Sequence, residues 1–169
     1  MAPESESTNE KLTKRNRELS ILNTIADALN REVDLNRALD AALRKIAELF
    51  DVQTSWVWLQ REDTGATYLA AALNLPPGLA EHPERMDGRS YCFCLDKYAL
   101  GEMENARNVS IVTCTRLQGL HEGTKGLRYH ASVPLYHHNQ RIGVLNVVSA
   151  DWRELSEDDV RLLNTIGDL

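Results

Sequence analysis

The hydrophobic pattern of the chain is clearest near its C-terminal end, where two short apolar runs flank a polar turn. The runs are residues 131–136 and 142–148, and the turn is residues 137–141, which together predict a β-hairpin. The second run is almost continuously apolar, so we expect a strand in the middle of a sheet with both faces covered. Pro134 cannot donate a ladder hydrogen bond, which predicts a place at a sheet edge or a bulge.

Helical periodicity marks the N-terminal end. Residues 1–8 are polar, and we expect them to form a disordered tail. Residues 9–33 predict one long signalling and dimerisation helix with two apolar stripes. A heptad-like seam would face a partner helix while the second stripe faces its own domain; one wide core stripe is the alternative. The seam consists of Leu12, Arg15, Leu19, Leu22, Ala26 and Leu29, and the second stripe of Ile21, Ile25 and Ala28.

The next elements are a helix and two strands. Asp34 is a suitable N-cap for the helix that follows it. Residues 54–60 and 66–73 are rich in strand formers and enclose a turn, which predicts another hairpin. Trp56 and Trp58 are two positions apart, so we expect both side chains on one face of the sheet.

A last helix is predicted at the C-terminal end. Ser156 and Asp159 resemble a capping box, and Leu155 with Val160 resembles a hydrophobic staple. No C-cap follows Leu169, so we expect the helix to continue into an output domain of a longer parent chain.

Residues 79–130 are irregular and carry all three cysteines. Within them, residues 95–100 predict a short helix ended by Gly101, and residues 108–112 predict a short strand. A stretch this long with so little periodicity is usually functional in a compact domain, so the function is expected here.

Composition narrows the class of protein. Hydrophobic residues make up 43% and charged residues 26%, as in ordinary globular domains. The net charge of −6 and the lack of a basic cluster argue against nucleic-acid binding. No apolar run reaches membrane-spanning length and no secretory signal is present, so we expect a cytoplasmic location. The common catalytic motifs are missing, which predicts a non-catalytic domain.

The order helix, helix, hairpin, insert, hairpin, helix resembles the GAF domain family. The likeness is strongest in Val-Pro-Leu from Val133, Arg-Ile-Gly-Val-Leu-Asn-Val from Arg141, and Leu-Ser-Glu-Asp-Asp-Val-Arg-Leu-Leu from Leu155. It implies an α+β fold over residues 34–169, with an antiparallel sheet of five or six strands, terminal helices on one face and a ligand pocket on the other. GAF domains are sensory modules that commonly dimerise through their terminal helices and signal to an attached kinase, cyclase or transcription factor.

The insert resembles GAF sensors of bacterial two-component histidine kinases. The segments that carry this likeness are Tyr-Cys-Phe-Cys-Leu from Tyr91, the stretch ending Cys-Thr-Arg-Leu, and Gly-Leu-Arg-Tyr-His from Gly126. Among these sensors the arrangement is similar to a subgroup that senses redox state, oxygen or nitric oxide through an iron–sulfur cluster bound by cysteines. The resemblance implies a metal site made by Cys92, Cys94, Cys114 and a fourth ligand, with His130 or His121 as candidates.

The residues themselves leave other roles open for the cysteines. Soft thiolates bind iron–sulfur clusters, zinc or copper(I), and an odd number of thiols excludes a full disulfide framework. On an extended segment, Cys92 and Cys94 would point the same way. Zinc held by Cys3His, a reversible disulfide from either residue to Cys114, and buried structural thiols are the alternatives.

Aromatic and basic residues complete the expected ligand pocket: Trp56, Trp58, Tyr91, Arg116 and Tyr129. Arg116 and Arg128 flank the insert, and we expect them to form surface ion pairs; binding of an anion such as nitrate is the alternative. His137 and His138 are expected in a solvated turn.

The combined expectation is the sensory input domain of a sensor histidine kinase that forms a homodimer through its terminal helices, without nucleic acid or membrane as a partner. The alternatives are a GAF-type enzyme that reduces free methionine sulfoxide and a ligand-free GAF domain that serves only in dimerisation.

Overall fold

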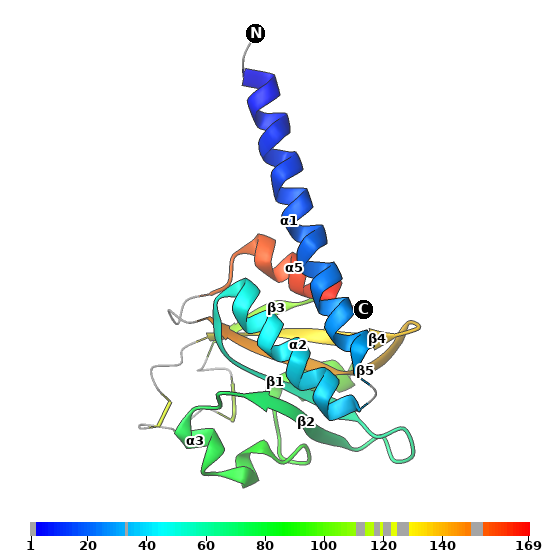
Figure 1. The fold of residues 1–169 in the computed structure, drawn as a ribbon. Helices are drawn as coiled ribbons and strands as arrows, with labels where there is room; N and C mark the ends of the chain where they lie inside the picture. Colours follow the sequence, from blue (N-terminus) through cyan, green and yellow to red (C-terminus); the bar gives the residue numbers. More distant parts are fainter. Residues whose placement is uncertain are drawn as a thin grey trace.

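The computed structural model describes residues 3–32, 34–110, 114–116, 119, 123–124, 129–149 and 154–169. These residues form a five-stranded antiparallel sheet in the order β2-β1-β5-β4-β3 (Figure 1). The α+β prediction is therefore confirmed, with β5 in the middle of the sheet as expected. The strands are β1 Val52–Gln60, β2 Thr67–Leu73, β3 Arg107–Ser110, β4 Tyr129–His137 and β5 Gln140–Ser149.

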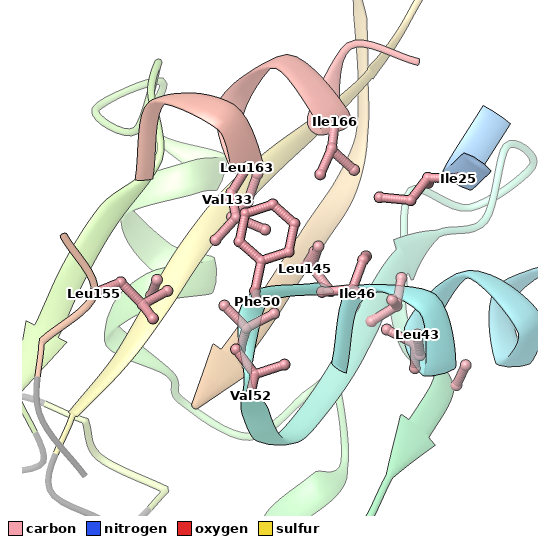
Figure 2. Close-up of a cluster of buried hydrophobic side chains, with 14 of the residues drawn as sticks. Ile25, Leu43, Ile46, Phe50, Val52, Val133, Leu145, Leu155, Leu163 and Ile166 are labelled. Carbon is pink, nitrogen blue, oxygen red and sulfur yellow. The ribbon is translucent and has the colours of Figure 1, made fainter. Parts of the chain in front are cut away.

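The two faces of the sheet are covered by different parts of the chain. The helices α1 (Pro3–Arg31), α2 (Leu35–Phe50) and α5 (Glu157–Gly167) supply the first buried cluster, and Figure 2 shows its side chains between the helices and the sheet. The insert supplies the second cluster on the opposite face. Its short elements are α3 Pro77–Ala80, the 3-10 turn η1 Pro83–Met86, and α4 Phe93–Ala99.

Strand β5 shows why both faces must be covered. Leu145 and Val147 belong to the helix-side cluster, whereas Val144 and Val148 belong to the insert-side cluster. Successive side chains of a strand point to opposite faces, so an unbroken apolar run needs a layer on each side.

Strand β1 follows the same alternation. Trp56 and Trp58 are both buried in the insert-side cluster, which confirms that they share a face, while Val57 between them faces the helices.

The β4–β5 hairpin turns more tightly than predicted. Its two central residues, His138 and Asn139, have φ values of 47° and 63°. Two successive positive φ values are the requirement of a two-residue hairpin turn whose twist matches the strands. The predicted five-residue turn was too long, because residues 137, 140 and 141 still pair in the ladder.

Pro134 lies where the sheet has an edge. β3 pairs with β4 only from Tyr129 to Ser132, so Pro134 lies beyond the end of β3. An irregularity in the β4–β5 register follows between Leu135 and Tyr136. Both features agree with the prediction of an edge or a bulge.

The insert holds both predicted elements at shifted boundaries. The helix predicted at residues 95–100 is α4, which begins two residues earlier, and the strand predicted at residues 108–112 is β3. Residues 111 and 112 lie outside the described part.

Helix α1 begins at Pro3, whereas the sequence predicted a helix that begins at residue 9. Proline suits the first turn of a helix, because that turn has no use for its missing N–H. Ile21 and Ile25 of the second stripe are buried, as predicted. Leu12 and Leu19 of the seam are 58% and 47% exposed, and the first half of α1 projects beyond the domain (Figure 1). The alternative of one wide core stripe is wrong for that half.

The predicted N-caps of α2 and α5 are correct. The Asp34 side chain accepts a hydrogen bond from the Arg37 N–H at the start of α2, and that of Ser156 accepts one from the Asp159 N–H at the start of α5. In the described ranges, no helix has the length and apolar content that crossing a membrane requires.

The helix-side core yields a stability prediction. Leu163 on α5 is fully buried, so Leu163→Ala should lower the free energy of unfolding by about 2–5 kcal/mol through lost burial and a cavity. Leu12→Ala removes the same atoms from an exposed site and should change the free energy of unfolding by less than about 0.5 kcal/mol. Urea titration followed by circular dichroism measures both, and equal effects would contradict the packing described here.

Candidate functional site

The cysteines of the insert meet on the face of the sheet opposite the long helices. Cys92 is the extended N-cap residue of α4, and Cys94 lies in the first turn of that helix. All three cysteines are buried. The helix start brings the Cys94 thiol close enough to Cys92 to influence its ionisation. The extended segment assumed for the pair was wrong at Cys94, but their proximity was predicted correctly.

The segment that carries Cys114 is fastened to the start of α4. The Thr115 hydroxyl accepts a hydrogen bond from the Phe93 N–H at 3.4 Å and donates one to the Tyr91 carbonyl at 3.2 Å. The Cys114 N–H donates to the Ser110 carbonyl at 3.0 Å, just after β3. These bonds hold Cys114 in the same buried cluster as Cys94, whose ionisation it disfavours electrostatically.

Arg116 fastens the same segment to the η1 region. Its guanidinium donates to the carbonyls of Arg85, Asp87 and Ser90, with distances of 3.0 Å to Asp87 and 3.2 Å to Ser90. The guanidinium also lies 4.4 Å from the centroid of the Trp58 ring, and the residue is only 4% exposed. Its two Nη atoms therefore serve backbone carbonyls, while its Nε has no hydrogen-bond partner among the described residues. The burial of Arg116 does not fit surface ion pairing, and the anion site stays a prediction. Arg128 lies outside the described residues.

His130 on β4 approaches the cysteines from the sheet. Its Nε2 lies 3.9 Å from Cys94 Sγ, and its Nδ1 lies 3.3 Å from the Ser132 hydroxyl. The Ser132 hydroxyl donates to the Asn146 side-chain oxygen on β5 at 2.8 Å. Burial lowers the pKa of His130 to about 4, so the imidazole is neutral near pH 7.

The cysteine pair shares one proton. The hydrogen bond from Cys94 and the nearby positive charge of Arg116 lower the pKa of Cys92 to about 5, although burial acts in the opposite direction. The same hydrogen bond, together with burial, raises the pKa of Cys94 far above its ordinary value. Near pH 7 the pair is a Cys92 thiolate and a Cys94 thiol, and the thiolate balances the buried Arg116 charge.

The donor types at this centre suit a soft metal. Thiolates and a neutral imidazole are the ligands of zinc and iron–sulfur sites. In the ranges that the structure describes, no three Cys, His, Asp or Glu side chains are already grouped to hold a metal ion. His121 lies outside those ranges. The sulfur and nitrogen donors present therefore suit a soft metal by their chemistry. A metal site made by Cys92, Cys94, Cys114 and His130 stays a prediction.

The predicted pocket residues separate into two groups. Trp56 and Trp58 are buried beside the centre, and the rings of Trp56 and His130 lie 5.7 Å apart. Tyr91 is 64% exposed and does not line a buried pocket, and Tyr129 is half-buried at the start of β4. Tyr91 precedes the N-cap of α4, where the chain still runs along the surface.

The two histidines of the predicted turn are exposed in the β4–β5 hairpin. His137 and His138 stack on each other at the exposed hairpin tip, as expected of a solvated turn. Sequence reasoning missed Ser132 and Asn146. Their only signal was a single polar residue inside each apolar run.

The sequence of this chain matches a model of a known protein family. A family model described as "GAF domain" matches residues 32–169. The chain belongs to the GAF domain family. Its helix-covered sheet and its insert on the opposite face are the arrangement that the family resemblance implied.

This GAF domain is similar in sequence to a sensor kinase and similar in fold to proteins of other kinds. It is 33% identical over 157 residues to the sensor histidine kinase YhcY of Bacillus subtilis, covering 90% of this chain and 41% of that protein. The GAF domain of an Acinetobacter phosphoenolpyruvate-protein phosphotransferase has a similar fold, with a TM-score of 0.65, 21% identity and coverage of 90% and 89%. Free methionine-R-sulfoxide reductase from Neisseria meningitidis also has a similar fold, with a TM-score of 0.59 and 18% identity. The match covers 89% of this chain and 83% of the reductase chain.

The cysteine pair yields a pH prediction. In the metal-free protein, the ultraviolet absorbance of one thiolate should persist as the pH falls from 9 and disappear with a midpoint near pH 5. Arg116→Gln removes the nearby positive charge and should raise that midpoint by about one pH unit or more.

Arg89→Gln is the matched control, because Arg89 is an exposed arginine of the same region that pairs with Asp87. It should leave the midpoint unchanged. An Arg116→Gln titration that overlays the wild-type curve would show that Arg116 does not stabilise the Cys92 thiolate.

Proposed function

We propose that this GAF domain is the sensory input domain of a two-component sensor histidine kinase. Membership of the family and 33% identity to such a kinase support the proposal. The matched region covers 41% of that relative, which leaves room there for further domains. A regulatory role without catalysis is the corresponding proposal for this domain, with the kinase activity in another part of the parent chain.

We propose further that the input is redox chemistry at the cysteine centre. One observation carries this: two segments that are 20 residues apart in the chain are joined by hydrogen bonds, so that three buried thiols belong to one cluster and one of them lies 3.9 Å from an imidazole nitrogen. A thiolate poised beside a thiol is the state from which thiols bind metals or become oxidised. Purely structural cysteines would be neutral and would need no such arrangement.

An iron–sulfur cluster is the cofactor that we propose for this centre. Cys92, Cys94 and Cys114 would hold it through sulfur, and His130 would supply its nitrogen. When bound, the group would supply one-electron chemistry and sensitivity to oxygen or nitric oxide. The protein contributes the buried surroundings, the Arg116 charge and the fixed imidazole.

The output surface that we propose is the projecting half of α1. Leu12 and Leu19 are seven residues apart and exposed, which is the spacing of a helix seam awaiting a partner. A second copy of the chain would cover both leucines with its own, giving a homodimer. Ile21 and Ile25 fix the other half of the same helix to the sensory domain, so the helix is continuous from the core to the seam.

The redox proposal predicts the content of the anaerobically purified protein. It should carry iron and acid-labile sulfide and show visible absorption that air bleaches, measured by metal analysis and spectroscopy. Cys94→Ser should lose most of the iron, because it removes the central sulfur. His138→Ala at the exposed hairpin tip is the control and should keep it.

Other outcomes distinguish the alternatives. Zinc in place of iron, or thiols lost on mild oxidation without metal, would assign the corresponding chemistry to the same cysteines. A metal-free protein whose thiols do not react would contradict redox sensing and favour a dimerisation domain. The similarity in fold to the Neisseria protein is the reason to test for an enzyme. Turnover of free methionine-R-sulfoxide that Cys94→Ser abolishes would favour that alternative.

The dimer proposal predicts the effect of charge in the seam. Leu12→Asp with Leu19→Asp should weaken self-association by at least about tenfold, because two carboxylates would be buried against their copies. Thr13→Asp with Ser20→Asp places the same charges on another exposed side of α1 and should leave it intact. Light scattering after size exclusion measures both. A wild-type monomer, or equal effects of the two pairs, would contradict the seam.

A further inference from the structure

A buried chain of hydrogen bonds leads from the cysteine centre into the middle of the sheet. It runs from Cys94 through His130 and Ser132 to Asn146. Each of these side chains is at least nine-tenths buried, and they come from α4, β4 and β5. Polar groups placed so deeply need partners, so the direction of each bond matters.

The direction of the chain can be assigned from its far end. The Ser132 hydroxyl has one hydrogen, which it donates to the Asn146 side-chain oxygen. Its oxygen is then free to accept, so Nδ1 of His130 must be the nitrogen that carries hydrogen. In a neutral imidazole the other nitrogen is bare. Nε2 therefore presents a lone pair to the Cys94 sulfur.

We propose that Ser132 and Asn146 are positioning residues that hold His130 as the Nδ1–H tautomer, with a bare Nε2 facing Cys94. This inference rests on the proposed cysteine centre but names residues that lie outside it. A bare Nε2 can bind a metal ion beside the sulfur or accept the thiol hydrogen, and an Nε2–H can do neither. Partners of this kind commonly orient histidine ligands and tune their metals.

The reversed chain is the competing arrangement. It would begin with the Asn146 amide donating to Ser132 and end with an Nε2–H pointing at Cys94. In the arrangement found, the Asn146 amide nitrogen has no hydrogen-bond partner among the described residues. The Trp56 indole nitrogen, which belongs to the residue opposite Asn146 on β1, has none there either. These two buried donors without partners count toward the reversed chain, so the tautomer of His130 is the observable that decides between the two directions.

The test is a two-bond nitrogen–proton correlation spectrum of the reduced, metal-free protein with labelled histidines. The wild type should show His130 as the Nδ1–H tautomer. Asn146→Leu should move the tautomer ratio by roughly tenfold toward Nε2–H, because the freed Ser132 hydroxyl then donates to Nδ1. Ser132→Ala should move it in the same direction, because Nδ1–H loses its acceptor. Ser132→Thr retains the hydroxyl and should restore the wild-type ratio.

Ser55→Ala is the matched control. Ser55 is fully buried on β1, its hydroxyl has no hydrogen-bond partner among the described residues, and its register partner on β5 is Val147 rather than Asn146. It should leave the tautomer unchanged. An Nε2–H tautomer in the wild type, or a ratio that neither Asn146→Leu nor Ser132→Ala moves, would overturn the proposal.

Zinc titration separates this inference from the proposed function. Asn146→Leu and Ser132→Ala should bind zinc at least about tenfold more weakly than the wild type, with Ser55→Ala unchanged. If no protein binds zinc or iron but the tautomers behave as stated, only the metal proposal fails. If the wild type binds metal and the variants keep both its affinity and its tautomer, only the positioning role fails.

Discussion

Burial of β5 on both faces is the constraint that organises this domain. The strand lies between β1 and β4 and sends apolar side chains in both directions, so neither face can meet water. The long helices cover one face closely: a Cβ on Gly167 of α5 would lie 2.3 Å from the Pro134 carbonyl oxygen. The insert must cover the other face. An irregular segment thus becomes part of the core, and its polar groups must be satisfied locally.

Arg116 and Thr115 show how that is done. A buried guanidinium is costly unless it finds hydrogen bonds and a counter-charge. Here three carbonyls, the Trp58 ring and the Cys92 thiolate surround it. The same group therefore fastens the insert and favours the charged form of a cysteine. Fastening and reactivity are coupled, since removing the arginine would disturb both.

Periodicity was enough to predict most of the elements. The alternating and helical patterns placed β5, the two tryptophans and the helix N-caps correctly, because each depends on neighbours along the chain. The start of α1 was placed at residue 9 rather than at residue 3, because polar composition alone does not prevent a helix. Family resemblance, rather than spacing, supplied the identity of the domain and the face on which the candidate site lies.

The details of the site depend on contacts between distant residues, which no local pattern records. Arg116 was expected in a surface ion pair, with an anion as the alternative, because its carbonyl partners at residues 85–90 have no sequence signature. Tyr91 was placed in the pocket because it adjoins Cys92, but the chain enters the core only one residue later. Ser132 and Asn146 are partners across two strands, and only the register of β4 on β5 brings them together.

That register also limits how a signal can cross the domain. The cysteine centre and α1 lie on opposite faces of the sheet, so no side chain of the centre reaches the helix directly. The shortest route is one step along a strand. On β4, His130 faces the cysteines, while the next residue, Ala131, belongs to the helix-side cluster. On β5, Asn146 lies on the cysteine side, while the next residue, Val147, belongs to the helix-side cluster. A shift of β4 or β5 that follows a change at Cys94 would therefore act on the packing around Ile25, at the point where α1 leaves the domain toward its exposed seam.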